Sequence, residues 1–225
     1  MTNDDRSRAL IRRSFPGIAT EGLPFIGAGL ALTGLVASLN RRLALLPLAL
    51  TGLTTYFFRD PTRDVPADPR YLYAAADGRV ILVDEIEEPR FIKGPAYRIA
   101  TFLSIFDVHI NRSPCRGIVR YREHISGAFK AAWDKTVPEV NERNYLGIES
   151  PYGPILVVQI AGLVARRIVC WAEVDEEIAS GERFGLIRFG SRTDLIFPRS
   201  MGRPLVAPGA RVYGGVTPLG ECYEG

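Results

Sequence analysis

Two long apolar runs occupy the front of the chain, and short apolar runs alternate with turn residues behind them. The first run covers Leu23 to Leu39, the second covers Leu43 to Phe58, and Asn40-Arg41-Arg42 separates them. The runs have 17 and 16 residues and contain no charged residue. That is slightly fewer than the roughly 20 residues with which a helix crosses a bilayer. The pattern predicts two apolar helices joined by a basic turn.

We expect this helix pair to associate with a membrane. A hairpin that spans the bilayer with both ends in the cytoplasm would put Arg41 and Arg42 outside, against the positive-inside tendency. Two helices that dip into one leaflet fit better, with flanking arginines at headgroup level. Those arginines are Arg12, Arg13, Arg59 and Arg63. The alternative is a pair of core helices in a soluble domain.

The remainder of the chain predicts strands. A proline-punctuated stretch from 57 to 69 separates the two parts, so we expect a helical membrane-associated region over 1–60 and a β-rich body over 61–225. We therefore predict a mainly β fold, with a body of packed β-sheets behind the helix pair. The predicted strands are Arg79–Val83, Tyr97–Ser104, Gly117–Tyr121, Ile155–Ile160, Val164–Trp171 and Leu186–Phe189.

Composition excludes several classes of protein. The net charge is only +3 and no dense polybasic tail is present, so nucleic acid is not an expected partner. The three cysteines have no CxxC spacing, which fits a reducing cytoplasm better than a disulfide framework. With two histidines, His109 and His124, a His-rich metal site is excluded, and we expect no metal.

Three short motifs could carry chemistry. Asp77-Gly78 precedes a predicted strand, His109 lies among apolar neighbours, and Gly190-Ser191 follows an apolar run. Taken singly, each has an ordinary structural explanation: a turn, a hydrogen-bonded histidine and a second turn. Together, an Asp, a His and a Ser on separate segments form a nucleophile, base and orienting group if the fold brings them together.

An ordered set of segments resembles a known family. The segments are Phe58-Arg59-Asp60-Pro61, Ala76-Asp77-Gly78-Arg79-Val80, Phe106 to Pro114, Asn141-Glu142-Arg143, Gln159 to Gly162 running into Ala165 to Ile168, and Phe189-Gly190-Ser191-Arg192. In this order they resemble the short bacterial and archaeal type of phosphatidylserine decarboxylase proenzyme. The resemblance extends from about residue 57 to about residue 210, and the apolar front looks like the membrane-associated front of that family.

The resemblance implies a proenzyme that makes its own cofactor. Cleavage between Gly190 and Ser191 would give chains 1–190 and 191–225, and Ser191 would become a pyruvoyl group. His109 would take the Ser191 proton, and Asp77 would orient His109. Longer members of the family carry two histidines near His109, whereas this chain has Arg112 at the second position.

The resemblance also implies a substrate and a location. The pyruvoyl group would capture the amine of phosphatidylserine and act as the electron sink for its decarboxylation to phosphatidylethanolamine. Arg166, Arg167 and Arg192 are candidates for binding the lipid phosphate or carboxylate, although alternate arginines also simply solvate strands. We expect a peripheral protein on the cytoplasmic face of the cell membrane, and a heterodimer of the two chains that dimerises further.

Two other interpretations remain open at this point. One is a membrane-associated lipid hydrolase that uses Ser191, His109 and Asp77 without self-cleavage. The other is a β-sandwich module without catalytic activity, which two helices anchor to a membrane and in which the polar motifs serve only as turns.

Overall fold

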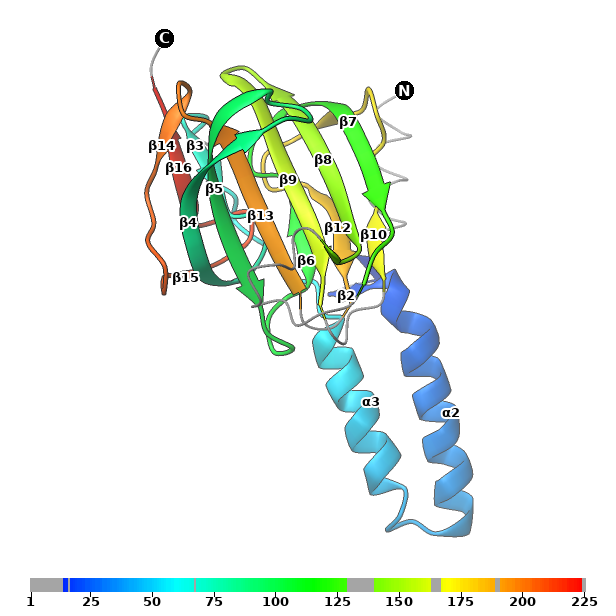
Figure 1. The fold of residues 1–225 in the computed structure, drawn as a ribbon. Coiled ribbons are helices and arrows are strands. Elements are labelled where there is room, and N and C mark those ends of the chain that lie inside the picture. Colours follow the sequence, from blue (N-terminus) through cyan, green and yellow to red (C-terminus); the bar gives the residue numbers. More distant parts are fainter. Residues whose placement is uncertain are drawn as a thin grey trace. The chain divides into compact units, whose positions relative to one another are not determined.

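The computed structural model describes residues 14–15, 17–66, 68–128, 140–162, 167–188 and 191–223. The chain divides into two compact units, Met1–Thr62 and Arg63–Gly225. The fold is mainly β, as the sequence predicts. Figure 1 labels the elements along the chain.

The first unit is a helical hairpin. After the short strands β1 (Ser14–Phe15) and β2 (Ile18–Ala19) come η1 (Thr20–Gly22), α2 (Leu23–Leu39) and α3 (Leu45–Phe57). Pro47 lies in the first turn of α3, where the N–H group that it lacks would have no helical partner. The hairpin closes at its base, because Asp60 N donates to Gly17 O at 2.8 Å.

Neither helix contains a charged residue, and α2, which is apolar on all sides, has no buried residue. The helices approach closely at Gly29, where an added Cβ would lie 2.3 Å from Thr51 Oγ1. The Thr33 and Thr51 hydroxyls each donate to the carbonyl four residues earlier, at 2.7 Å. Contacts between small residues and internally satisfied hydroxyls are typical of helices in lipid. By length and composition, Thr20–Leu39 could cross a membrane, with a mean hydropathy of 1.7.

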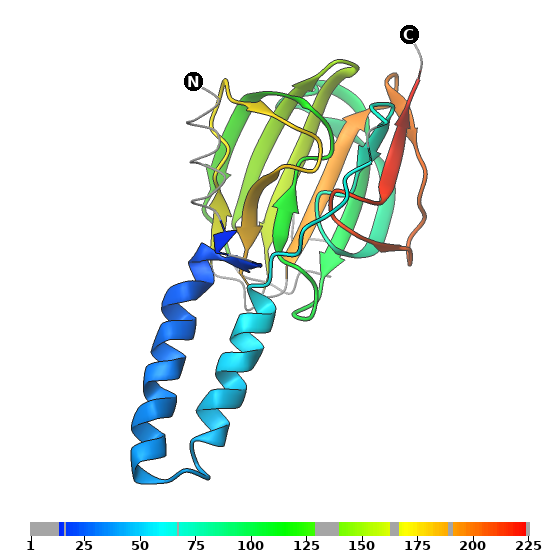
Figure 2. The same cartoon turned by 180° about the vertical axis from the view of Figure 1, so that it is seen from behind.

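The second unit is built on one curled antiparallel sheet with the strand order β11-β7-β8-β9-β13-β5-β4-β15. Two small sheets, β10-β12-β6 and β14-β16-β3, lie behind it in Figure 1 and in front of it in Figure 2. The strands are β3 (Tyr71–Tyr73), β4 (Gly78–Glu88), β5 (Gly94–Leu103), β6 (Ile110–Arg112), β7 (Gly117–Ile125), β8 (Arg143–Ser150), β9 (Gly153–Ala161), β10 (Ile168–Cys170), β11 (Glu177–Ile178), β12 (Arg183–Ile187), β13 (Ser191–Pro198), β14 (Gly202–Pro204), β15 (Arg211–Val212) and β16 (Pro218–Cys222).

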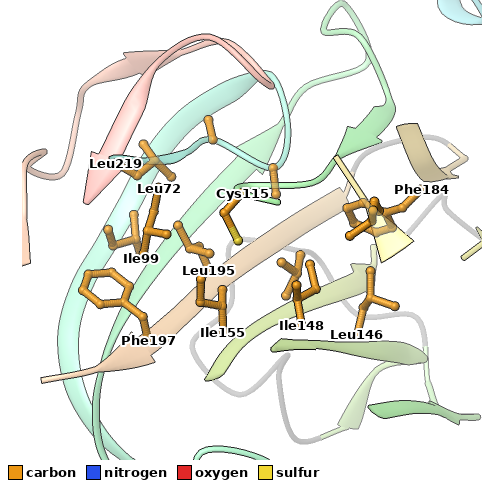
Figure 3. Packing of buried hydrophobic residues seen from close by; sticks show 14 of the residues in the cluster. Leu72, Ile99, Cys115, Leu146, Ile148, Ile155, Phe184, Leu195, Phe197 and Leu219 are labelled. Atoms are coloured by element: carbon orange, nitrogen blue, oxygen red, sulfur yellow. The ribbon is translucent and has the colours of Figure 1, made fainter. Parts of the chain in front are cut away.

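The main hydrophobic core lies between the large sheet and the two small ones. Leu195 and Phe197 of β13 point into it together with residues from strands on all three sheets (Figure 3). Because side chains alternate along a strand, Ser191 and Thr193 share this face of β13 with them, while Arg192 and Asp194 point to the other face. That other face has its own cluster, which includes Ile196 and Leu156.

The tip of the β4–β5 hairpin folds against the second face of the sheet. Phe91 stacks on Tyr121 with ring centroids 6.0 Å apart, and Arg90 forms an ion pair with Glu123 at 2.5 Å. The Glu88 carboxylate accepts N–H groups from residues 90, 91 and 92 and so holds the tip in shape. Both faces of β13 are therefore enclosed, as expected for a central strand.

Candidate active site

The strand register brings three of the predicted site segments to one end of the large sheet. Ser191, the first residue of β13, pairs with Leu103 at the end of β5 and with Ala161 at the end of β9. Asp77 directly precedes β4, whose Arg79 pairs with Phe102 beside Leu103. The loop that carries His109 begins directly after Leu103. Asp77, His109 and Ser191 thus belong to segments that meet at the same sheet end.

Ser191 is completely buried, and its hydroxyl is not satisfied by the residues described. Its relative exposure is 0%, and Oγ has no hydrogen-bond partner among them. An unsatisfied buried hydroxyl costs about 1–3 kcal/mol, so such a group needs an explanation, and a role in catalysis is one. Gly190, the other half of the predicted cleavage site, lies outside the described residues.

His109 is buried and is oriented by the backbone. Its Nδ1 lies 2.9 Å from the carbonyl oxygen of Asp107. Because a carbonyl only accepts, Nδ1 is the nitrogen that carries the proton, and Nε2 of the neutral ring is the basic atom. Its own carbonyl accepts from Ile187 N at 3.3 Å, which ties His109 to β12, four residues before Ser191.

Asp77 is also buried, and its carboxylate has two partners. Arg63 Nη2 lies 2.7 Å from Oδ2, and Gly214 N donates to Oδ1 at 2.8 Å. Burial raises the pKa of Asp77, although the Gly214 N–H and the Arg63 guanidinium oppose the shift. Among the described residues, the Asp77 carboxylate bonds to these groups and not to His109 or Ser191. The three segments thus share a sheet end, but in the described part of the chain no hydrogen bond links the Asp77 carboxylate to either of the other two side chains.

Asp107 has a structural role that sequence reasoning did not assign. Its Oδ2 accepts from both the N–H and the hydroxyl of Ser104 at 2.7 Å, and Arg211 forms an ion pair with Oδ1. Burial opposes its ionisation, but the hydrogen bonds from Arg211 and Ser104 lower the pKa of Asp107 overall. The sequence feature that could have indicated this role is Ser104, three residues before Asp107, because serine and aspartate are both common in turns. This turn holds the His109 loop.

A second feature missed from the sequence is a chain of buried amides below Ser191. Asn144 Nδ2 donates to Gln159 Oε1 at 2.9 Å, and Gln159 Nε2 donates to Asn111 Oδ1 at 2.8 Å. Asn111 Nδ2 then reaches Thr193 Oγ1 at 3.3 Å. The chain ties β8, β9 and β6 to β13, two residues from Ser191, and fixes where β13 begins.

The three candidate arginines are in different environments. Arg192 is buried and forms a bidentate ion pair with Asp194, at 2.6 and 2.9 Å, on the face of β13 opposite Ser191. Arg167 is exposed, and its carbonyl accepts from Arg188 N. Arg166 lies outside the described residues. Within the described part of the chain, no group of three or more His, Cys, Asp or Glu side chains could hold a metal ion.

Comparison with known proteins decides the family. A family model described as phosphatidylserine decarboxylase matches residues 50–220, which is more than half of the chain. The chain belongs to the phosphatidylserine decarboxylase family. The match covers β3 to β15 and therefore Asp77, His109 and Ser191. It confirms the family predicted from the order of the motifs, and with it the prediction of an enzyme.

Similar proteins carry the name of this family along nearly their whole length. The phosphatidylserine decarboxylase proenzyme of Symbiobacterium thermophilum is 50% identical over 210 residues, covering 93% of this chain and 97% of that protein. The proenzyme of Carboxydothermus hydrogenoformans is 44% identical over 201 residues, covering 89% of this chain and 94% of that protein. For Desulfotalea psychrophila the identity is 43% over 206 residues, with coverage of 91% and 96%. The word proenzyme in these names describes a precursor that must be processed.

Proposed function

We propose that the chain is a membrane-associated phosphatidylserine decarboxylase that activates itself by cleavage between Gly190 and Ser191. The observation that carries the proposal is the Ser191 hydroxyl, which is buried and unsatisfied among the described residues at the start of the central strand. A hydroxyl that water and substrate cannot reach is suited to attack its own backbone. Membership of a family whose relatives are named proenzymes supports the same reading.

In the proposed activation, Ser191 Oγ attacks the Gly190 carbonyl as His109 Nε2 takes the hydroxyl proton. The peptide C–N bond breaks, the nitrogen gains a proton, and an ester joins Gly190 to Ser191. Elimination removes the Ser191 α-proton and releases the Gly190 carboxylate, leaving a dehydroalanine at residue 191. Water then hydrolyses its imine tautomer and releases ammonia, which leaves a pyruvoyl group on residue 192. Glycine at 190 suits the strained approach, because it has no Cβ to obstruct the hydroxyl.

Asp77 remains our candidate for the third residue of the proposed catalytic set, beside Ser191 and His109. Its carboxylate is buried at the same sheet end, where its negative charge would favour the protonated ring of His109. The Asp107 carbonyl already fixes the orientation of that ring. Asp77 would therefore act through its charge rather than by holding the imidazole directly.

The Ser191 position fits the pyruvoyl group, since pairing with β5 and β9 on both sides holds residue 191 in a fixed place. The pyruvoyl group supplies an electron sink, which accepts the electron pair of the bond that breaks as carbon dioxide leaves. After decarboxylation His109 is the proposed source of the proton that replaces carbon dioxide. Arg167 remains a proposed contact for the lipid headgroup, and Arg166 stays a prediction.

The two products of cleavage would remain together. The rear chain, 191–225, contains 225 − 190 = 35 residues and contributes β13, which is paired along both edges. Leu195 and Phe197 anchor it in the main core. We therefore propose a heterodimer of the two chains, and the family resemblance implies that this pair dimerises further.

The helical unit would hold the enzyme at the cytoplasmic face of the membrane. At 1.5 Å per residue, α2 is about 26 Å long and α3 about 20 Å, against a hydrocarbon core of about 30 Å. Because α3 is too short to cross, a shallow hairpin fits better than a spanning one. The exposed leucines on both helices support insertion into lipid.

The competing hydrolase needs a serine that an ester can reach. In the uncut chain the relative exposure of Ser191 is 0%, which argues against the hydrolase, since an ester would have to reach the intact hydroxyl. The proposed decarboxylase needs access to residue 191 only after the chain is cut in front of it. The test is carbon dioxide release from phosphatidylserine vesicles by the purified chain and by Ser191→Ala. We expect release by the first only. Ester hydrolysis, with labelling of intact Ser191 by a fluorophosphonate, would establish the hydrolase instead.

A further inference from the structure

Two large apolar side chains project from the loop between β5 and β6. Ile105 is 45% exposed and Phe106 is 61% exposed. Single exposed apolar residues are ordinary on a protein surface, whereas grouped ones rimmed by polar residues are a feature of surfaces that contact a protein or a membrane. We call this pair the apolar tip.

The apolar tip is held in place by hydrogen bonds around it. The Asp107 carboxylate, directly after Phe106, accepts the Ser104 N–H and hydroxyl, both at 2.7 Å. Asp107 N in turn donates to Ser104 O at 2.9 Å. These bonds close a tight turn whose two central residues are the exposed ones. The fold thus presents the tip outward on a fixed turn.

The tip lies beside the candidate active site in the chain and in the sheet. Leu103, which pairs with Ser191, comes two residues before Ile105, and His109 comes three residues after Phe106. Whatever the tip inserts into is therefore brought next to the residues proposed to react with substrate.

A tyrosine with two arginines lies near the tip. Tyr213 is 43% exposed, and the guanidinium carbons of Arg63 and Arg211 lie 5.7 and 5.5 Å from its ring centroid. Arg211 also forms the ion pair with Asp107, so one carboxylate connects this group to the turn that carries the tip. Tyrosine and arginine are the side chains that settle at the headgroup layer of a bilayer.

We propose that the apolar tip inserts into the surface of a phospholipid bilayer, while Tyr213 and Arg211 contact the headgroups around it. This inference rests on the proposed function, because a lipid-modifying site must reach a substrate that stays in the membrane. The residues of the docking surface belong to the catalytic unit and not to the unit that contains the helical hairpin. The hairpin keeps the chain on the membrane, and the tip turns the reactive sheet end toward it.

The test compares Phe106→Ser with Val174→Ser in the full chain. Val174 is 49% exposed and lies at the opposite end of the sheet, where the next residue, Asp175, bonds to Val119. Substrate is given either as vesicles of phosphatidylcholine and phosphatidylserine or as short-chain phosphatidylserine below its micelle concentration. We expect Phe106→Ser to lower activity on dilute vesicles about tenfold, the effect of leaving one large apolar side chain in water. Activity on the monomeric lipid should be unchanged, and Val174→Ser should change neither.

Equal losses on both substrates would overturn the proposal, because they would indicate a role in the reaction itself. No loss on either, or a change of oligomeric state by size-exclusion chromatography, would overturn it as well. If Phe106→Ser does not fold, Phe106→Trp provides a second test, with brominated phospholipid as quencher. Quenching above that of the unmodified chain is expected for Phe106→Trp and not for Val174→Trp, and equal quenching would refute insertion.

The quenching measurement needs no catalysis, so it separates this inference from the proposed function. A chain that inserts its tip but never decarboxylates would refute the function and leave the docking surface standing. A chain that decarboxylates phosphatidylserine in vesicles at the normal rate, but whose tip does not insert, would refute the docking surface and leave the function standing.

Discussion

The buried ion pair between Arg192 and Asp194 yields a prediction whose size follows from the structure. The two side chains are 2% and 3% exposed and bond in a bidentate manner on the face of β13 opposite Ser191. Removal of one partner leaves the other charge buried and uncompensated, which costs about 3–5 kcal/mol. In a chain of this size each kcal/mol lowers Tm by about 2–4 °C, so Arg192→Leu should lower it by about 6–20 °C.

The double variant Arg192→Leu/Asp194→Leu should recover most of that loss. Its leucines would face apolar neighbours, since Arg192 pairs with Ile160 and Asp194 with Val158. Replacement of a whole buried ion pair by apolar residues is often neutral or stabilising. The pair would then contribute specificity of register at the cleavage strand more than stability.

The assay is thermal unfolding in detergent of the two single variants and the double one. All carry Ser191→Ala, so that each protein is one uncut chain. The exposed pair Arg203–Glu221, with side chains 63% and 26% exposed, provides the matched control. Arg203→Leu there should cost no more than about 1 kcal/mol.

A different result would favour the role first predicted from the sequence. If Arg192→Leu left Tm unchanged, and in the cleavable chain raised KM for phosphatidylserine with kcat intact, Arg192 would be a substrate contact. The structural reading of the pair would then be wrong.

Three further predictions concern the sheet end that holds the candidate site. Gly78→Ala should prevent cleavage, because its Cβ would lie 2.1 Å from Phe102 O, whereas Gly94→Ala, with nothing within 4 Å, should be cut normally on denaturing gels. If Asp77 acts ionised, the cleavage rate should fall as the pH is lowered through the pKa of Asp77, which burial raises above the usual value of about 3.9. The variant Asp77→Asn should cleave slowly, and its rate should not show this fall at low pH. A pH profile of cleavage that is the same in both proteins would remove Asp77 from the mechanism. Gln159→Leu should cost about 2 kcal/mol or more in urea unfolding, because it leaves two buried amides unsatisfied, and a neutral result would contradict the amide chain.

Local sequence patterns were sufficient to predict the class of several elements. The two runs at the front form α2 and α3, and the β-branched runs appear within β4, β5, β7 and β9. A long apolar run indicates a helix, and a short β-branched run between turn residues indicates a strand, whatever its partners in the fold. The mainly β fold was predictable for this reason, whereas the family was predicted from the order of the motifs.

The strand that begins at Ser191 was not predictable in the same way. Its first four residues, Ser191 to Asp194, are polar, and by spacing alone Gly190-Ser191 indicated a turn at the end of an apolar strand. In the structure these four residues form the start of a buried central strand, because Arg192 pairs with Asp194 and Thr193 bonds to Asn111 from β6. Asn111 is 82 residues away in the chain, so no local pattern contains that partner.

The candidate site was predictable as residues but not as an arrangement. Asp77, His109 and Ser191 stood out by their motifs, and the strand register brings their segments together. The role of Asp107 depends on Arg211, which is 104 positions further along the chain. Such long-range partners decide the orientation of His109, and only the folded chain shows them.

The most direct test of the central claim is the intact mass of the purified protein under denaturing conditions. The account predicts two chains, 1–190 and 191–225, with the shorter one blocked to Edman degradation and lighter by about 17 mass units than its unmodified sequence, because conversion of serine to a pyruvoyl group removes the elements of one ammonia molecule overall. Ser191→Ala should give one chain of 225 residues. An active protein whose mass corresponds to the unbroken chain would contradict self-cleavage at Ser191 and the mechanism built on it.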